Sequence, residues 1–126
     1  MASHNDLGKK GEGLAKVWLT EQGYELLHQN WRYSHYEVDI IARKKDILHF
    51  IEVKARSSEQ FGYPEESVGK KKILNLMQAA EAYLYQFPEW KHIQYNILSI
   101  LIRNNHPHEY FFIEDVYLND DLGYEL

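Results

Sequence analysis

Two acidic residues and a lysine whose types and spacing could bind a cation and act on a phosphate lie within residues 37–54. Asp39 is followed, thirteen positions later, by the triplet Glu52-Val53-Lys54. Carboxylate oxygens are the ligands that hard cations such as Mg²⁺ prefer, and such a cation stabilises phosphate charge and acidifies a bound water. A lysine on the same side would position that water or neutralise charge that develops during attack.

The same stretch predicts a β-hairpin. Apolar-rich runs at residues 38–42 and 47–53 flank a charged tip at residues 43–46. With the turn centred on residues 45 and 46, residues whose numbers sum to 91 lie opposite each other. Asp39 then faces Glu52, and Glu37 faces Lys54. Like charges placed opposite each other destabilise a sheet, so we expect a divalent cation between Asp39 and Glu52.

Side chains alternate along a strand, so Glu37, Asp39, Glu52 and Lys54 are expected on one face. The other face is uniformly apolar and consists of Val38, Ile40, Ile51 and Val53. Two structural interpretations stay open at this point. One is a solvated hairpin face with a cross-strand pair between Glu37 and Lys54. The other is a structural α/β domain whose carboxylates pair with Lys54 and Arg56.

Helical patterns lie on both sides of the hairpin. A first helix is expected from a cap at Asn5 or Asp6 to about Gln22, and its Gly8 and Gly11 indicate close approach of a backbone or a ligand beside Glu12. A second helix is expected from a cap at Ser67 to Phe87. Its first turn carries three lysines that either face solvent or contact phosphate at the helix N-terminus: Lys70, Lys71 and Lys72.

The remaining patterns predict strands at residues 24–33, 93–102 and 110–117, the last at a sheet edge. The run at 93–102 is almost continuously apolar, which is typical of a strand covered on both faces. A long helix between two strands predicts a right-handed parallel crossover. The expected order is therefore α-β-β-β-α-β-β.

Composition indicates one domain over residues 1–126, with a core at about 5–103 and an acidic extension at 104–126. The net charge is −5, but residues 106–126 carry six acidic and no basic residues, and the remaining 105 carry 14 basic and 13 acidic ones. The body is therefore compatible with a local basic surface. There is no cysteine, no apolar run long enough for a membrane span and no signal-peptide pattern, so a cytoplasmic protein is expected.

An ordered set of further residues accompanies the triplet: Gly8, Gly11, Glu12, Ala15, Leu27, Asn30, Arg32, Glu37, Asp39–Ala42, Phe50–Lys54, Arg56, Pro64, Val68, Lys72, Leu76, Ala79, Ala80, Tyr83 and Leu84. This set resembles the YraN-like family of small bacterial proteins, within the PD-(D/E)xK nuclease superfamily, over roughly residues 8–102. The resemblance implies an α/β fold with a restriction-endonuclease-like αβββαβ core, in which helices flank a mixed central sheet.

The resemblance also implies roles for individual residues. By analogy with archaeal Holliday-junction resolvases, Glu12 joins Asp39, Glu52 and Lys54 in the catalytic set. Mg²⁺ or Mn²⁺ would be held by Asp39, Glu52, Glu12 and the Val53 carbonyl. Arg56 and the three helix lysines would extend the contact with DNA, and Glu37 is a supporting residue.

The chain departs from the family pattern at two places. Tyr36 stands where glycine is usual, and Asn96, a supporting residue, stands where aspartate is usual. The function expected is a metal-dependent endonuclease that acts on DNA, with branched or flapped DNA and a two-fold dimer implied by the resolvase analogy alone. The alternative is a weakly active or inactive module that keeps the fold and binds nucleic acid or protein. No nucleotide-binding glycine loop is present.

Overall fold

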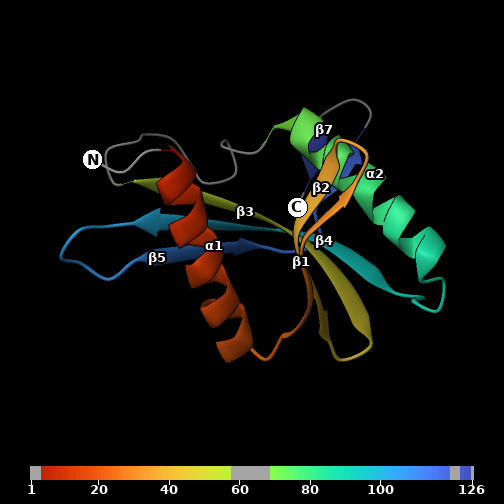
Figure 1. Ribbon diagram of the computed structural model, residues 1–126, viewed down its shortest axis with the longest axis horizontal. Helices are drawn as coiled ribbons and strands as arrows, with labels where there is room; N and C mark the ends of the chain where they lie inside the picture. Colours follow the sequence, from red (N-terminus) through yellow and green to blue (C-terminus); the bar gives the residue numbers. More distant parts are fainter. Residues whose placement is uncertain (1–3, 58–68, 120–122, 126) are drawn as a thin grey trace.

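The order of helices and strands agrees with the sequence prediction as far as the strand expected at 110–117, which ends at Ile113, and the short strands at 117–119 and 123–125 were not predicted. The computed structural model describes residues 4–57, 69–119 and 123–125 (Figure 1). Its elements, in chain order, are α1 (His4–Glu21), β1 (Glu25–Tyr33), β2 (Tyr36–Lys44), β3 (Ile47–Ser57), α2 (Lys70–Gln86), β4 (Ile93–Ile102), β5 (Glu109–Ile113), β6 (Tyr117–Asn119) and β7 (Gly123–Glu125). The expected cap Ser67 lies outside the described residues, and the N-cap of α2 is Gly69, without a side-chain hydrogen bond.

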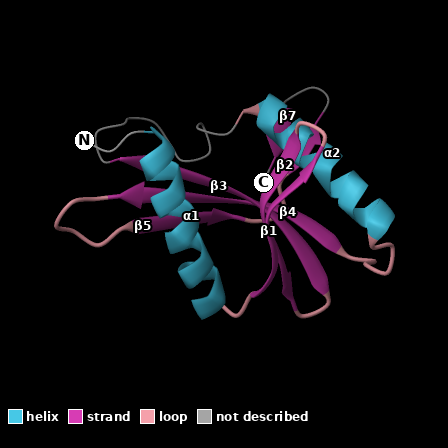
Figure 2. Ribbon diagram, viewed as in Figure 1, coloured by secondary structure: helices cyan, strands magenta, loops and turns pink. Residues whose placement is uncertain are grey.

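Five strands form one mixed sheet in the order β1-β2-β3-β4-β5, and β6 pairs with β7 separately (Figure 2). β3 and β4 are parallel, whereas β1–β2, β2–β3 and β4–β5 are antiparallel. Helix α2 provides the crossover between the parallel pair. The predicted mixed α/β architecture with an αβββαβ core is therefore confirmed, and β5 occupies the predicted edge.

The hairpin register is the predicted one, but the ladder is shorter than expected. β2 pairs with β3 from Ile40 opposite Ile51 to Lys44 opposite Ile47. From Val38 back to Tyr36, β2 pairs only with β1, and the last of these pairs is Tyr36 opposite Tyr33. The expected pairs of Asp39 with Glu52 and of Glu37 with Lys54 are therefore wrong as ladder partners.

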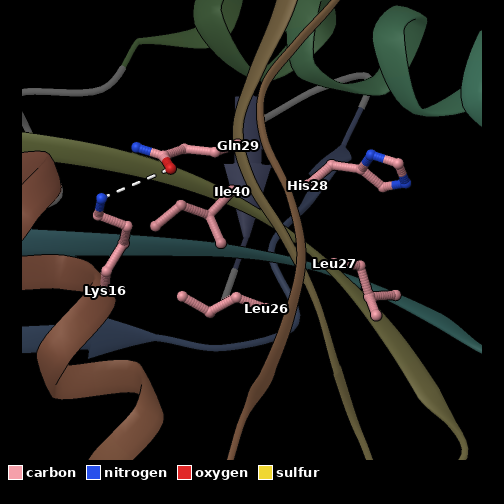
Figure 3. Close-up of a pocket in the computed structure, with 6 residues that line it drawn as sticks. All are labelled: Lys16, Leu26, Leu27, His28, Gln29 and Ile40. Atoms are coloured by element: carbon pink, nitrogen blue, oxygen red, sulfur yellow. Dashed lines mark hydrogen bonds between the residues drawn. The ribbon is translucent and has the colours of Figure 1, made fainter.

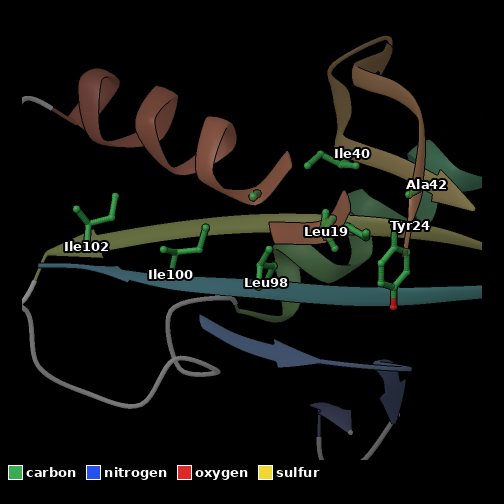
Figure 4. Close-up of a cluster of buried hydrophobic side chains, with 9 residues drawn as sticks. Leu19, Tyr24, Ile40, Ala42, Leu98, Ile100 and Ile102 are labelled. Atoms are coloured by element: carbon green, nitrogen blue, oxygen red, sulfur yellow. The ribbon is translucent and has the colours of Figure 1, made fainter. Parts of the chain in front are cut away.

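The two long helices cover opposite faces of the sheet. On one face, Ala15 and Leu19 of α1 pack with Ile40, Ile51 and neighbouring apolar side chains (Figure 4). On the other face, the buried residues of α2 recur at helical spacing and pack with β2 and β3: Leu76, Ala79, Ala80 and Tyr83 against Val38, Ile41, Leu48 and Phe50. Figure 1 shows α1 crossing the half of the sheet that carries β5.

The alternation of β2 side chains between the two faces of the sheet is interrupted next to Asp39. Val38 and Ile41 both belong to the α2 cluster, whereas Ile40 belongs to the α1 cluster. Residues 38 and 41 cannot share a face in a regular strand, because side chains alternate. The prediction that Val38 lies with Ile40, Ile51 and Val53 on one face is therefore wrong, and the backbone is irregular at the position of Asp39.

Neither helix in the described ranges is both long and apolar enough to cross a membrane.

Candidate active site

Asp39 lies where β2 separates from β3. The main-chain ladder ends at Ile40, and one residue further the Asp39 Oδ2 accepts a hydrogen bond of 2.8 Å from the backbone N–H of Val53. The Asp39 carboxylate thus accepts a hydrogen bond from a β3 N–H just beyond the end of the β2–β3 ladder. This fixes one oxygen of Asp39 beside the Glu52-Val53-Lys54 triplet.

The environment of Asp39 is strongly acidic. Burial, followed by repulsion from Glu52, raises the pKa of Asp39 from 3.8 to about 8, although the Val53 hydrogen bond lowers it. Smaller contributions that raise the same pKa come from Glu12 and Glu37. The structure therefore brings carboxylates from α1, β2 and β3 close enough to Asp39 to raise its pKa.

Glu52 lies on the sheet face that α2 covers and is only 8% exposed. Its Oε1 is 3.4 Å from the Nζ of Lys72, in the first turn of α2. Burial raises the pKa of Glu52, and the Lys72 ammonium opposes that rise. Glu37 also raises this pKa and Lys54 lowers it. A buried carboxylate in such surroundings requires a cation, which Lys72 supplies here.

Glu12 is brought to the site by the close packing of α1 on β3. A Cβ added to Gly11 would lie 2.5 Å from the Cβ of Ala55, so the absence of a side chain allows the close approach predicted at Gly11. At Gly8 the predicted approach of a backbone is wrong, because nothing in the described part of the chain lies within 4 Å of an added Cβ. The next residue, Glu12, contacts Asn30 of β1. The amide of Asn30, with its nitrogen turned toward the carboxylates, donates to Glu12 Oε1 at 2.9 Å and to Glu37 Oε1 at 3.2 Å.

Replacing Gly11 by alanine should destabilise the protein by about 1–3 kcal/mol, because the added methyl group overpacks against Ala55. Gly8→Ala is the matched control: nothing lies within 4 Å of the methyl group that this substitution adds, so the variant should gain up to about 1 kcal/mol from helix propensity. Urea unfolding measures the free energy of unfolding of both variants. A Gly11→Ala variant as stable as Gly8→Ala would contradict the close approach of α1 to β3.

Asn30 is a site residue whose role the sequence did not reveal. Its φ is +52°, in the left-handed region that asparagine tolerates better than most residues. It lies between the pairs Gln29–Ile40 and Trp31–Val38, next to Asp39 across the β1–β2 ladder. The signals available were its residue type and its place in the family motif, and neither indicated a bridge between Glu12 and Glu37.

Glu37 pairs with a different partner from the one expected. Its Oε2 is 3.2 Å from Arg32 of β1, and these residues are opposite each other in the β1–β2 register. The cross-strand pair of Glu37 with Lys54 is therefore not formed. The position of Glu37, held by Arg32 and Asn30, is consistent with the supporting role predicted for it.

The predicted basic residues lie around the same end of the site. Lys54 is exposed and Arg56 is buried, both at the carboxyl end of β3. Lys70, Lys71 and Lys72 are exposed and form the start of α2. Of these, Lys72 contacts Glu52, an ion pair that the sequence did not predict.

Asn96 is in a different environment from the carboxylates. It is fully buried on the face of the sheet that α1 covers, where its Nδ2 is 2.9 Å from His49 Nδ1 and its Oδ1 accepts from the Asp115 N–H at 3.0 Å. The amide uses both its donor and its acceptor in this packing. Its departure from aspartate therefore leaves the cluster of Asp39 and Glu52 unchanged.

The donor set fits a hard divalent cation. The clustered acidic side chains offer oxygen only, and burial raises the pKa values of Asp39 and Glu52, so a cation beside them would stabilise their charged forms. Within the described ranges, no three acidic or histidine side chains already form a group arranged to hold a metal. Lys72 and Asn30 engage oxygens of Glu52 and Glu12, so a cation would have to displace these contacts.

A surface hollow of about 140 Å³ lies between α1 and β1, close to this cluster but separate from it (Figure 3). Leu26 and Ile40 form its apolar wall, and Lys16 reaches Gln29 across it at 3.5 Å. The carboxylates themselves do not line it. The candidate site is thus not part of this hollow.

Comparison with known proteins gives a consistent assignment. Residues 11–102 match the model of the uncharacterised protein family UPF0102. A UPF0102 protein of Bacteroides thetaiotaomicron is 42% identical over 104 residues, which cover 82% of this chain and 86% of the relative. A UPF0102 protein of Flavobacterium johnsoniae is 44% identical over 104 residues, 79% of this chain and 85% of the relative.

A third relative, the UPF0102 protein of Parabacteroides distasonis, is 42% identical over 101 residues, covering 80% of this chain and 84% of its own. The matched region includes α1 from Gly11 onward, the hairpin with its carboxylates, α2 and β4. The resemblance predicted from the motifs is confirmed, and the chain belongs to the uncharacterised, YraN-like protein family UPF0102.

Proposed function

We propose that this protein is an Mg²⁺- or Mn²⁺-dependent endonuclease that hydrolyses DNA phosphodiesters. The observation that carries the proposal is the convergence of the half-buried Asp39 and the buried Glu52, two carboxylates with raised pKa values, where β2 separates from β3. Such an arrangement is unfavourable for folding unless a cation or a proton compensates it. Perturbed carboxylates of this kind are typical of functional sites.

In this proposal Asp39 and Glu52 hold the cation, and Glu12 and the Val53 carbonyl complete its ligands. The bound cation supplies positive charge to the phosphate and an acidified water. Asp39 is oriented for this role by the Val53 N–H, and Glu12 is positioned by Asn30 and by the contact of Gly11 with Ala55. Lys54, exposed and close enough to Glu52 to lower its pKa, would neutralise charge on the attacked phosphate.

Two neighbouring basic groups would contact the DNA backbone. Lys70 and Lys71 are exposed in the first turn of α2, the turn that also carries Lys72. Such contacts make binding dependent on salt concentration. The preference for branched or flapped DNA, and a two-fold dimer, rest on the resolvase analogy and are part of the proposal.

The test is a cleavage assay with branched, flapped and single-stranded DNA in Mn²⁺. Wild type should produce fragments, and Lys54→Ala should lower the rate by about 10²–10³-fold, a typical cost of removing one group that stabilises transition-state charge. The exposed Lys45 at the opposite end of the hairpin gives the matched control Lys45→Ala, which should cleave like wild type. Products that persist unchanged in Lys54→Ala would assign the activity to another protein.

A further inference from the structure

The ion pair between Lys72 and Glu52 joins a flexible side chain to a fixed one. The Lys72 side chain is 61% exposed and the Glu52 side chain 11% exposed. Lysine carries its charge on a flexible four-carbon stem, whereas Glu52 is held in β3, the central strand of the sheet. The carboxylate therefore stays in place, and the ammonium is the partner that can move.

The contact is also loose. Its N–O distance is 3.4 Å, longer than the roughly 2.7–2.9 Å of a strong charge-assisted hydrogen bond. Lys72 thus satisfies the buried Glu52 without locking it, so release of the lysine requires only that another cation take its place.

A divalent cation that binds Oε1 of Glu52 competes with the Lys72 ammonium for the same negative charge. Metal–oxygen distances are about 2.0–2.6 Å for Mg²⁺ and Ca²⁺, so a cation on Glu52 Oε1 would lie within a few ångströms of Nζ as the structure places it. Like charges at that distance repel strongly in a half-buried site. Binding of the metal must therefore move Lys72 toward solvent, where Lys70 and Lys71 already lie.

We propose that Lys72 is an exchangeable counter-ion: it neutralises Glu52 until a divalent cation binds, and the cation then releases it to contact a phosphate of the nucleic acid. This inference rests on the proposed function, because it requires that Glu52 hold a metal. It makes Lys72 a positioning residue that couples the two binding steps. Metal binding strengthens DNA binding, and by linkage DNA binding strengthens metal binding.

The first measurement is calorimetric titration of Mn²⁺ into the full chain at pH 8.5, without DNA. Lys72→Met should bind Mn²⁺ about 5- to 20-fold more tightly than wild type, because the competing charge is gone. Lys72→Arg keeps the charge and should bind within about twofold of wild type. Lys71→Met removes an exposed neighbouring charge that has no such contact with Glu52 among the described residues and should also stay within about twofold.

The second measurement is fluorescence polarisation of a labelled branched DNA, with and without Ca²⁺ as a probe cation. Wild type should bind the DNA at least tenfold more tightly with Ca²⁺, and Lys72→Met should lose at least two-thirds of that gain. A merely structural lysine would change neither quantity, since Lys72 is exposed and the fold does not depend on its packing.

The outcomes separate this inference from the proposed function. Mn²⁺ binding that is equal in wild type and Lys72→Met would overturn the counter-ion role and leave the metal site intact. No Mn²⁺ binding to either protein would overturn both. Tighter Mn²⁺ binding in Lys72→Met with an unchanged Ca²⁺-dependent gain in DNA affinity would also overturn the proposal, because it would show that the released lysine contacts no phosphate.

Discussion

Glu52→Gln should lower the rate of Mn²⁺-dependent DNA cleavage by about a thousandfold or more while the protein stays folded. The substitution preserves the shape of a side chain that is only 11% exposed, so packing changes little. It removes the charge that would hold the cation. A bound metal contributes several kcal/mol of transition-state stabilisation, and each 1.36 kcal/mol corresponds to about tenfold in rate.

Glu37→Gln is the matched control for this prediction. Glu37 is a carboxylate of the same cluster, but Arg32 and Asn30 already engage both of its oxygens. Its loss should slow cleavage by less than about tenfold. Rates are measured under single-turnover conditions, with circular dichroism to verify folding. Equal losses in the two variants would show that general negative charge, rather than a metal ligand at Glu52, supports the activity.

The sequence predicts the hairpin register correctly, but not the place where the ladder ends. Apolar residues at 38, 40, 51 and 53 fit a regular period of two, and this period assigns Val38 to the same face as Ile40. The structure places Val38 against α2 instead. An apolar residue satisfies a core on either face of the sheet, so the pattern contains no information about the irregularity at Asp39.

The contributions of the two helices to the site differ in how far they can be predicted. Gly11 beside Glu12 indicated a close approach, and the contact with Ala55 is that approach. The Lys72–Glu52 pair was beyond prediction, because these residues are 20 positions apart and their contact depends on how the crossover sets the start of α2 over β3. Helix propensity fixes neither the position nor the tilt of a helix on a sheet.

The polar pair of His49 and Asn96 shows a third limit. In the sequence, Asn96 is one of three polar residues, with Gln94 and Ser99, in a largely apolar strand, and its family position associated it with the acidic site. In the structure its amide bridges His49 and the Asp115 N–H on the opposite face from Glu52. Tyr24 packs edge-on against His49, and burial lowers the pKa of that histidine. Only tertiary structure distinguishes such a buried network from a ligand.

Without a divalent cation, Asp39→Asn should be more stable than wild type at pH 8, by about 1–3 kcal/mol. The pKa of Asp39 is about 8 in the folded protein, against 3.8 for the ordinary carboxyl. Below pH 4 the group is protonated in both the folded and unfolded states. Between pH 4 and 8 the unfolded chain releases the proton and the folded one retains it, so wild type loses stability as the pH rises.

Asparagine does not titrate, so the advantage of Asp39→Asn should be absent near pH 4, grow through this window and level off above pH 8. Its side-chain oxygen can still accept the Val53 N–H, which keeps the local geometry. Urea unfolding in EDTA at pH 4.5, 6 and 8 measures the difference. A difference that is constant with pH would contradict the buried, acidic environment assigned to Asp39.

Addition of Mn²⁺ should reverse the order of stabilities at pH 8. A cation that binds only the folded state stabilises it by about 2.7 kcal/mol at a hundred times its Kd, and wild type has the carboxylate that binds it. Asp39→Asn lacks that charge and should gain little. Asp39 would thus lower the stability of the protein without metal and raise it when metal is bound. This is the trade-off between stability and function expected of an active-site carboxylate. An equal gain in both proteins would place the cation elsewhere and exclude Asp39 as its ligand.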